Sequence, residues 1–285
     1  MAAETERDAV TGRETTGHEW DGIKELNNPL PTWWLYTFYA SIVFAIVWSV
    51  LYPSLPWLDG VLGHSERRSI VATMNKAAAE QRPYVDRILK TSLDEIRVDP
   101  DLLTFARTGG RIAFNNNCVP CHQAGGAGTR GYPSLADDDW LWGGTLAEIE
   151  QTIRFGIRTE HDKTHSSMMP RFGADSMLTS AQIDDVVEYV RSLSKSPHDA
   201  ARAARGAGVY AENCVACHME GGAGNREIGA PALNDAIWLY GGDRAAIRTS
   251  VFMARSGVMP AWQDRLDDAT IKMLTLYVHG LGGGK

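Results

Sequence analysis

The pattern Cys-x-x-Cys-His occurs twice in this sequence, from Cys118 to His122 and from Cys214 to His218. Residues three apart share one face of a helical turn, so the two thiols of a motif can add to the vinyl groups of one haem while the imidazole binds its iron. A lone motif would also suit a zinc site, a redox disulfide or a structural bridge. The chain has 4 cysteines, all within these motifs. We therefore expect two covalently attached haem c groups, held by Cys118, Cys121, Cys214 and Cys217, with His122 and His218 on the irons.

The two motifs are part of a tandem repeat that begins near residue 101. The stretch from Pro133 to Gly144 matches the stretch from Pro231 to Gly242 without a gap, and Gly-Gly-Ala-Gly follows each motif. Each copy is long enough for a small globular domain, so we expect two domains in series rather than a solenoid.

Each repeat copy is predicted to be all-α. A first helix leads into the haem motif, a middle helix covers 146–156 or 244–254, and a terminal helix lies within the matching stretches 178–194 and 266–282. The terminal helices place their apolar residues on one face, which predicts a core position for Ile183, Val186, Val187, Val190, Ile271, Leu274 and Val278. The prediction is an all-α chain with two tandem class I-like cytochrome c domains, at residues 101–196 and 201–285.

A methionine precedes proline in a loop after each motif, at Met169-Pro170 and Met259-Pro260. Thioether sulfur opposite histidine is a common sixth ligand of haem iron and raises its reduction potential. We expect Met169 and Met259 to be these ligands. Met168 is a competitor, and the first copy also carries His161 and His165, which would suit a bis-histidine haem.

Two questions about the haem sites stay open in the sequence. Each methionine could complete the site of its own copy or of the other copy, and we favour its own, because the sequence gives no sign of an exchange. Four rings have polar donors suited either to haem propionates or to simple core packing. They belong to Trp140, Trp142, Trp238 and Tyr240.

A membrane span is predicted near the start of the chain, at residues 32–54. From Thr32 to Tyr52 no residue is charged, and these residues would form a helix of about 30 Å, the thickness of a bilayer's hydrocarbon core. Trp33 and Trp34 at one end, and Trp48 and Trp57 at the other, suit the two membrane interfaces. A buried core helix or a cleaved signal peptide fits this length and position less well.

The segments that flank the span suggest its orientation. Residues 1–31 form a polar, acidic tail, and residues 55–100 read as a helical linker with one helix ending before Pro83. Lys24 on one side and Arg67 and Arg68 on the other slightly favour a cytoplasmic linker. Haem attachment to this motif takes place outside the bacterial cytoplasm, so we expect the opposite: a cytoplasmic N-terminus and periplasmic haem domains.

Charge excludes one class of function. The net charge is −7, and the chain has no basic run, so a nucleic-acid partner is not expected.

The entry to the span carries a more specific pattern. Asp21-Gly22-Ile23, then Asn28-Pro29-Leu30-Pro31-Thr32-Trp33-Trp34, one span and two haem domains with Met-Pro loops resemble the CcoP/FixP subunit of cbb3-type cytochrome c oxidases. The resemblance covers nearly the whole chain and implies the same eight ligand residues. Some members of that family have two spans, whereas this sequence has one.

This resemblance implies an electron-transfer subunit of a bacterial inner-membrane complex, with no catalysis of its own. Its expected partners are a cytochrome c donor or bc complex, a monohaem cytochrome subunit, the haem–copper subunit that reduces O₂, and the lipid bilayer. The alternatives are an electron-transfer subunit of another respiratory complex and a dihaem peroxidase, which needs one iron with an open site.

Overall fold

The computed structural model describes residues 5–57 and 60–282. These residues fall into two compact units, Met1–Glu80 and Gln81–Lys285. Helices dominate both units, as the sequence predicts, with one short sheet in the first.

The first unit begins with a hairpin that the sequence reading missed. Strands β1 (Thr15–Trp20) and β2 (Ile23–Leu26) pair antiparallel across a tight turn. Asp21 and Gly22 at this turn both have positive φ, +48° and +82°. That is the geometry of the turn type that Asp-Gly favours between strands, so the dipeptide was the available signal.

The hairpin is followed by α1 (Thr32–Leu51), a 20-residue helix with no buried residue. Its mean hydropathy is 1.8, which makes it long and apolar enough to cross a membrane. A helix that is apolar all round and has no buried residue is suited to a lipid environment.

A long helix, α2 (Glu66–Lys90), begins in the first unit and ends in the second. The sequence predicted a stop before Pro83, but α2 continues through it. An interior proline costs about 3 kcal/mol. Packing after Pro83 offsets this cost, since the Tyr84 ring stacks on Phe105 at 4.8 Å and Ile88 is fully buried.

The second unit contains the rest of the helices. Short α3 (Leu93–Val98) is followed by α4 (Pro100–Asn117), and α5 (Val119–His122) with η1 (Ala124–Gly126) comes next. The order continues with α6 (Leu146–Phe155), α7 (Ser180–Leu193), α8 (Ala200–Asn213), α9 (Val215–His218), η2 (Glu220–Gly222), α10 (Arg244–Met253) and α11 (Asp268–His279).

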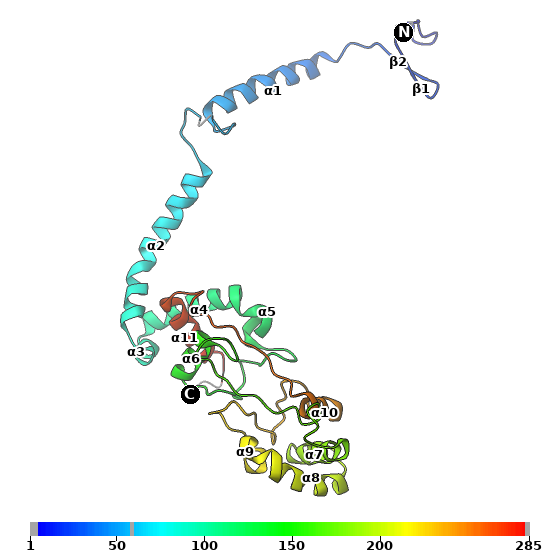
Figure 1. Ribbon diagram of the computed structural model, residues 1–285. Helices are drawn as coiled ribbons and strands as arrows, with labels where there is room; N and C mark the ends of the chain where they lie inside the picture. Colours follow the sequence, from blue (N-terminus) through cyan, green and yellow to red (C-terminus); the bar gives the residue numbers. More distant parts are fainter. Residues whose placement is uncertain (1–4, 58–59, 283–285) are drawn as a thin grey trace. The chain divides into compact units, whose positions relative to one another are not determined.

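The terminal helices of the two repeat copies are exchanged. In Figure 1 the red α11 lies beside α4, and α8 lies beside α7; α6 packs on α11 and α10 packs on α7. The helix that precedes the first copy's motif thus packs on the second copy's terminal helix, and the helix that precedes the second copy's motif packs on the first copy's terminal helix. The expected division into 101–196 and 201–285 differs from this packing, because α7 and α11 each bury their apolar face against the other copy.

We therefore define two modules by packing. Module 1 contains α4 to α6, the segment 157–165 and, from the end of the chain, residues 255–282 with α11. Module 2 is the continuous stretch 166–254, with α7 to α10. The residues that the sequence assigned to the cores of the terminal helices are all buried: Ile183, Val186, Val187, Val190, Ile271, Leu274 and Val278.

Glycines permit both exchanged crossings. A Cβ on Gly110 in α4 would overlap the carbonyl oxygen of Met273 in α11, and a Cβ on Gly206 in α8 would overlap the carbonyl oxygen of Asp185 in α7. At both crossings the two helix backbones are in direct contact, which only glycine allows.

Gly206→Ala and Gly208→Ala form a matched pair within α8. A Cβ added to Gly208 would meet no atom within 4 Å. Gly206→Ala should lower the free energy of unfolding by about 1–3 kcal/mol through overpacking, whereas Gly208→Ala should raise it by up to about 1 kcal/mol through helix propensity. Denaturant titration of the purified chain, followed by visible circular dichroism, measures both. Equal effects of the two substitutions would contradict the close crossing.

Candidate functional site

Each Cys-x-x-Cys-His motif forms one turn of helix at the end of a longer helix. The backbone N–H of Cys118 donates to Phe114 at 2.8 Å, and that of His122 donates to Cys118 at 2.8 Å. The second motif repeats these bonds from Cys214 to Tyr210 at 2.9 Å and from His218 to Cys214 at 2.9 Å. The turn holds both thiols and the imidazole of each motif together, as the spacing predicts.

The imidazole of each motif is oriented by a backbone carbonyl. His122 Nδ1 donates to the carbonyl oxygen of Pro133 at 3.0 Å, and His218 Nδ1 donates to that of Pro231 at 2.9 Å. With Nδ1 occupied, the free lone pair is on Nε2, which is the atom that would bind iron. Burial lowers the pKa of both imidazoles, against the opposing effect of the carbonyl bond, so both rings are neutral at pH 7, as a metal ligand requires.

The cysteines do not have the character of a redox pair. Among the described residues, no disulfide joins the two cysteines of either motif. Burial, and then the neighbouring cysteine, raises the pKa of Cys118 and of Cys214 to about 11. Redox motifs of the Cys-x-x-Cys type instead have a lowered thiol pKa, because the thiolate is the nucleophile.

The two methionines lie in different apolar clusters, and each cluster holds the motif of the other repeat copy. Met259 packs against the buried cluster that contains Phe114, and Cys118 and Val119 pack against the same cluster. Met169 packs against the buried cluster that contains Tyr210, and Cys214 and Val215 pack against that cluster. Our preference for ligation within one repeat copy differs from this arrangement.

Backbone bonds fix each methionine loop to the middle helix of its module. Met259 forms two backbone hydrogen bonds with Ile157, which lies just after α6. The N–H of Met259 donates to Ile157 O at 3.1 Å, and the N–H of Ile157 donates to Met259 O at 2.9 Å. In module 2, the N–H groups of Gly173 and Ala174 donate to Phe252 O in α10, at 3.3 and 3.0 Å. Each methionine loop is therefore held in the module of the middle helix to which it is bonded, and that helix belongs to the other repeat copy.

The competing ligands lie elsewhere. The Met168 side chain is 77% exposed. His165 has its Nε2 3.0 Å from Thr152 Oγ1 and its ring stacked on Trp142 at 4.4 Å. His161 lies against the Phe155 ring at 4.6 Å and accepts from the N–H of Lys163. The insertion thus uses its histidines in local packing.

The residues present fit a covalently attached haem. Trp140 Nε1 and Trp142 Nε1 are buried, and within the described ranges neither has a hydrogen-bond partner. A buried N–H without an acceptor is costly, and a haem propionate is an acceptor of the right kind. A cleft of about 490 Å³ also lies beside Trp140 and the second motif, lined in part by Met219 and Pro231.

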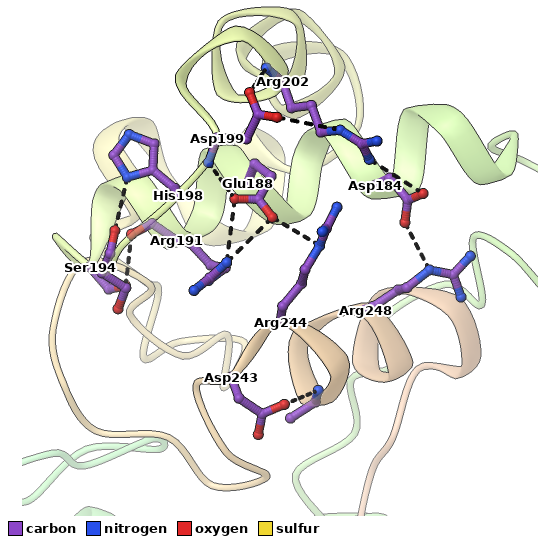
Figure 2. Close-up of polar contacts among 12 residues, drawn as sticks. Asp184, Glu188, Arg191, Ser194, His198, Asp199, Arg202, Asp243, Arg244 and Arg248 are labelled. Carbon is purple, nitrogen blue, oxygen red and sulfur yellow. Dashed lines mark hydrogen bonds and ion pairs between the residues drawn. The ribbon is translucent and has the colours of Figure 1, made fainter.

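Buried charge holds the helices of module 2 together. Glu188 of α7, 1% exposed, accepts from Arg244 Nε of α10 at 2.9 Å and from the backbone N–H of Asp199 at 2.8 Å, with Arg191 at 3.4 Å (Figure 2). Asp184 accepts from Arg248 Nε at 2.9 Å. These bonds join α7, α10 and the N-terminal cap of α8.

The sequence reading missed several of these positions. Pro133 and Pro231 act through main-chain oxygens, which no residue pattern displays, although their matched places in the repeat were visible. Glu188 and its partners are spread over three helices, so their proximity depends on the exchange of α7, which no local pattern indicates.

Family models match most of the chain. The model described as the N-terminal domain of cytochrome oxidase-cbb3, FixP, matches residues 12–59. The cytochrome c model matches residues 106–194, and the model for cytochrome c oxidase, cbb3-type, subunit III matches residues 201–278.

Curated relatives are similar over nearly the full length. A cbb3-type cytochrome c oxidase subunit CcoP of Azospirillum brasilense is 50% identical, covering 99% of this chain and 100% of its own. A FixP subunit of Bradyrhizobium diazoefficiens is 49% identical, covering 100% of both chains. A CcoP subunit of Cereibacter sphaeroides is 51% identical over 95% of both.

Glu188→Gln should destabilise module 2. The substitution leaves two partly exposed guanidinium groups beside a neutral amide, and losing the charged partner of these hydrogen bonds costs about 1–3 kcal/mol. Asp175→Asn is the control, since its pair with Arg171 is on the surface, where ion pairs contribute about 0–1 kcal/mol. Thermal unfolding of both variants tests this, and equal losses would contradict the role of the Glu188 cluster.

Proposed function

Because this chain belongs to the CcoP/FixP subunits of cbb3-type cytochrome c oxidases, we propose that it is a membrane-anchored electron-transfer subunit with two haem c groups. It partners the oxidase complex and is not the catalytic subunit. Bound haem supplies one-electron redox chemistry, and the chain's own residues hold it, orient its ligands and exclude water.

The ligand assignment crosses between the repeat copies. We assign His122 and Met259 to the haem on Cys118 and Cys121, and His218 and Met169 to the haem on Cys214 and Cys217. The observation that carries this is that Met259 packs against the same apolar cluster as Cys118, and Met169 against the same cluster as Cys214. A partly buried methionine in each cluster also favours an electron carrier over a peroxidase, which needs an open iron.

Other groups of the chain, from both main chain and side chains, tune the two sites. The carbonyls of Pro133 and Pro231 fix the imidazole rings, which raises ligand basicity. Trp140 and Trp142 offer N–H donors to propionates. Ligation by a methionine and a histidine would keep the reduction potential of a bound haem high, as a relay between a cytochrome c donor and an oxidase requires.

The membrane arrangement follows from the same proposal. Helix α1 is the anchor, the hairpin of β1 and β2 is cytoplasmic, and the haem modules are periplasmic in the bacterial inner membrane. The proposed partners are a soluble or anchored cytochrome c or bc complex as donor, and the monohaem and haem–copper subunits of the oxidase as acceptors. Purification in mild detergent tests this; recovery with a quinol-oxidising complex and no haem–copper subunit would contradict it.

The crossed ligation is tested by Met259→His in a Cys121→Ser background. Cys121→Ser leaves one thioether bond and marks the first haem by a shifted absorption band. Met259→His should lower the potential of the marked haem by on the order of 100 mV, a modest part of the ~0.8 V range that axial ligands span. Spectroelectrochemical titration separates the two haems.

Two further variants control this experiment. Met169→His should lower the potential of the unmarked haem, and Met168→His, at an exposed neighbouring position, should change neither. If Met259→His instead shifted the potential of the unmarked haem, each methionine would be the ligand of the haem in its own repeat copy.

The orientation is tested with single introduced cysteines. Ser69→Cys and Thr11→Cys lie at exposed positions on opposite sides of α1. In spheroplasts, a membrane-impermeant maleimide should label Ser69→Cys and should label Thr11→Cys only after lysis. The reverse pattern would place the haem modules in the cytoplasm.

A further inference from the structure

Arg158 lies where the first repeat copy has an insertion, in the segment that connects α6 to the first Met-Pro loop. Its guanidinium makes two hydrogen bonds to main-chain oxygens from distant parts of the chain. Nε donates to Gly257 O at 2.6 Å, and Nη1 donates to Ser167 O at 3.2 Å. Gly257 is two residues before Met259, and Ser167 is two residues before Met169. One side chain therefore holds the start of both methionine loops.

The backbone beneath Arg158 is itself firmly held. Arg158 N–H donates to His165 O at 2.8 Å, and the preceding Ile157 pairs with Met259. Thr164 Oγ1 accepts from Thr159 N–H and donates to Gly156 O, each at 3.1 Å. Arg158 also has a φ of +55°, a conformation that costs a non-glycine residue about 1–2 kcal/mol. The surrounding bonds must hold this conformation, so the guanidinium projects from a fixed base.

The charge of Arg158 is directed at these two carbonyls. Among the described residues no carboxylate pairs with it, and burial lowers its pKa, opposed only by Tyr240. A guanidinium stays protonated in proteins, and its hydrogen bonds are stronger than neutral ones. A second bond strengthens the tie to module 2, because Ser167 Oγ donates to Ile228 O.

The second repeat copy supplies no equivalent brace among the described residues. Its nearest arginine, Arg255, donates to Ala246 O at 2.7 Å and to Ser250 Oγ at 2.9 Å, both in α10, and its guanidinium lies 4.7 Å from the Tyr240 ring. Arg255 thus bonds only to α10, whereas Arg158 bonds to the loops of both methionines.

We propose that Arg158 is a positioning residue shared by both haem sites: its two hydrogen bonds brace the loops of Met169 and Met259 together and so set both sulfur ligands. The proposal rests on the assignment of these two methionines as ligands.

The test compares Arg158→Gln with wild type in the purified oxidase complex containing both haems. The readouts are the methionine–iron charge-transfer band of each oxidised haem, both potentials, and amide exchange of residues 166–170 and 256–260. Arg158→Gln should weaken the band and lower the potential at both haems. Exchange should rise about tenfold in both loops, the factor expected from losing a hydrogen bond to a charged group.

Arg171→Gln is the matched control. Arg171 lies two residues after Met169, but its side chain is exposed and pairs with Asp175, so this variant should leave both haems unchanged. Arg158→Lys keeps the charge but presents a single ammonium, so it should restore at most one loop. If Arg158→Gln fails to retain both haems, the same measurements on Arg158→Lys provide the test.

Three results would overturn the proposal: a change at one haem only in Arg158→Gln, no change at either, or full restoration of both loops by Arg158→Lys. The wild-type spectrum separates this failure from failure of the ligand assignment. Absence of a methionine–iron band in the wild type would contradict the ligands themselves, whereas a band that Arg158→Gln leaves intact contradicts only the brace.

Discussion

Gly110 and Gly206 let the helix that leads into each haem motif touch the backbone of a terminal helix from the other repeat copy. This contact decides the rest of the second unit. Once α4 lies on α11 and α8 lies on α7, the middle helices and the methionine loops must follow, because each loop is bonded to its own middle helix. Neither module can complete its core from one repeat copy alone.

The exchange also couples the two haem sites. Met259 belongs to the cluster of Cys118, and Met169 to that of Cys214, so each site draws on both repeat copies. Two carriers that share loops are expected to respond together to a perturbation. This arrangement suits a relay, in which a fixed distance between the two haems matters more than independent motion of two domains.

Features of this architecture that depend on local spacing could be predicted from the sequence, whereas contacts between distant parts of the chain could not. The span, the motif turns and the buried faces of α7 and α11 depend on local spacing, which a sequence displays directly. Local spacing does not indicate which helix each terminal helix packs against, since Ile183 and Ile271 would suit the core of either copy equally well. Pro83 failed as a helix stop because the packing of Tyr84 and Ile88 outweighs its cost. The hairpin at Asp21-Gly22 had a readable turn signal that the acidic composition obscured.

Module 2 is continuous in the chain, whereas module 1 is closed only by residues 255–282. Since a chain is delivered from its N-terminus, the second haem segment can reach its native contacts while α4 still lacks α11. The first motif in the chain is therefore the last to be enclosed. Cys118 and Cys121 remain open until the final helix arrives, which gives the attachment of haem at that site the longer period in an accessible chain.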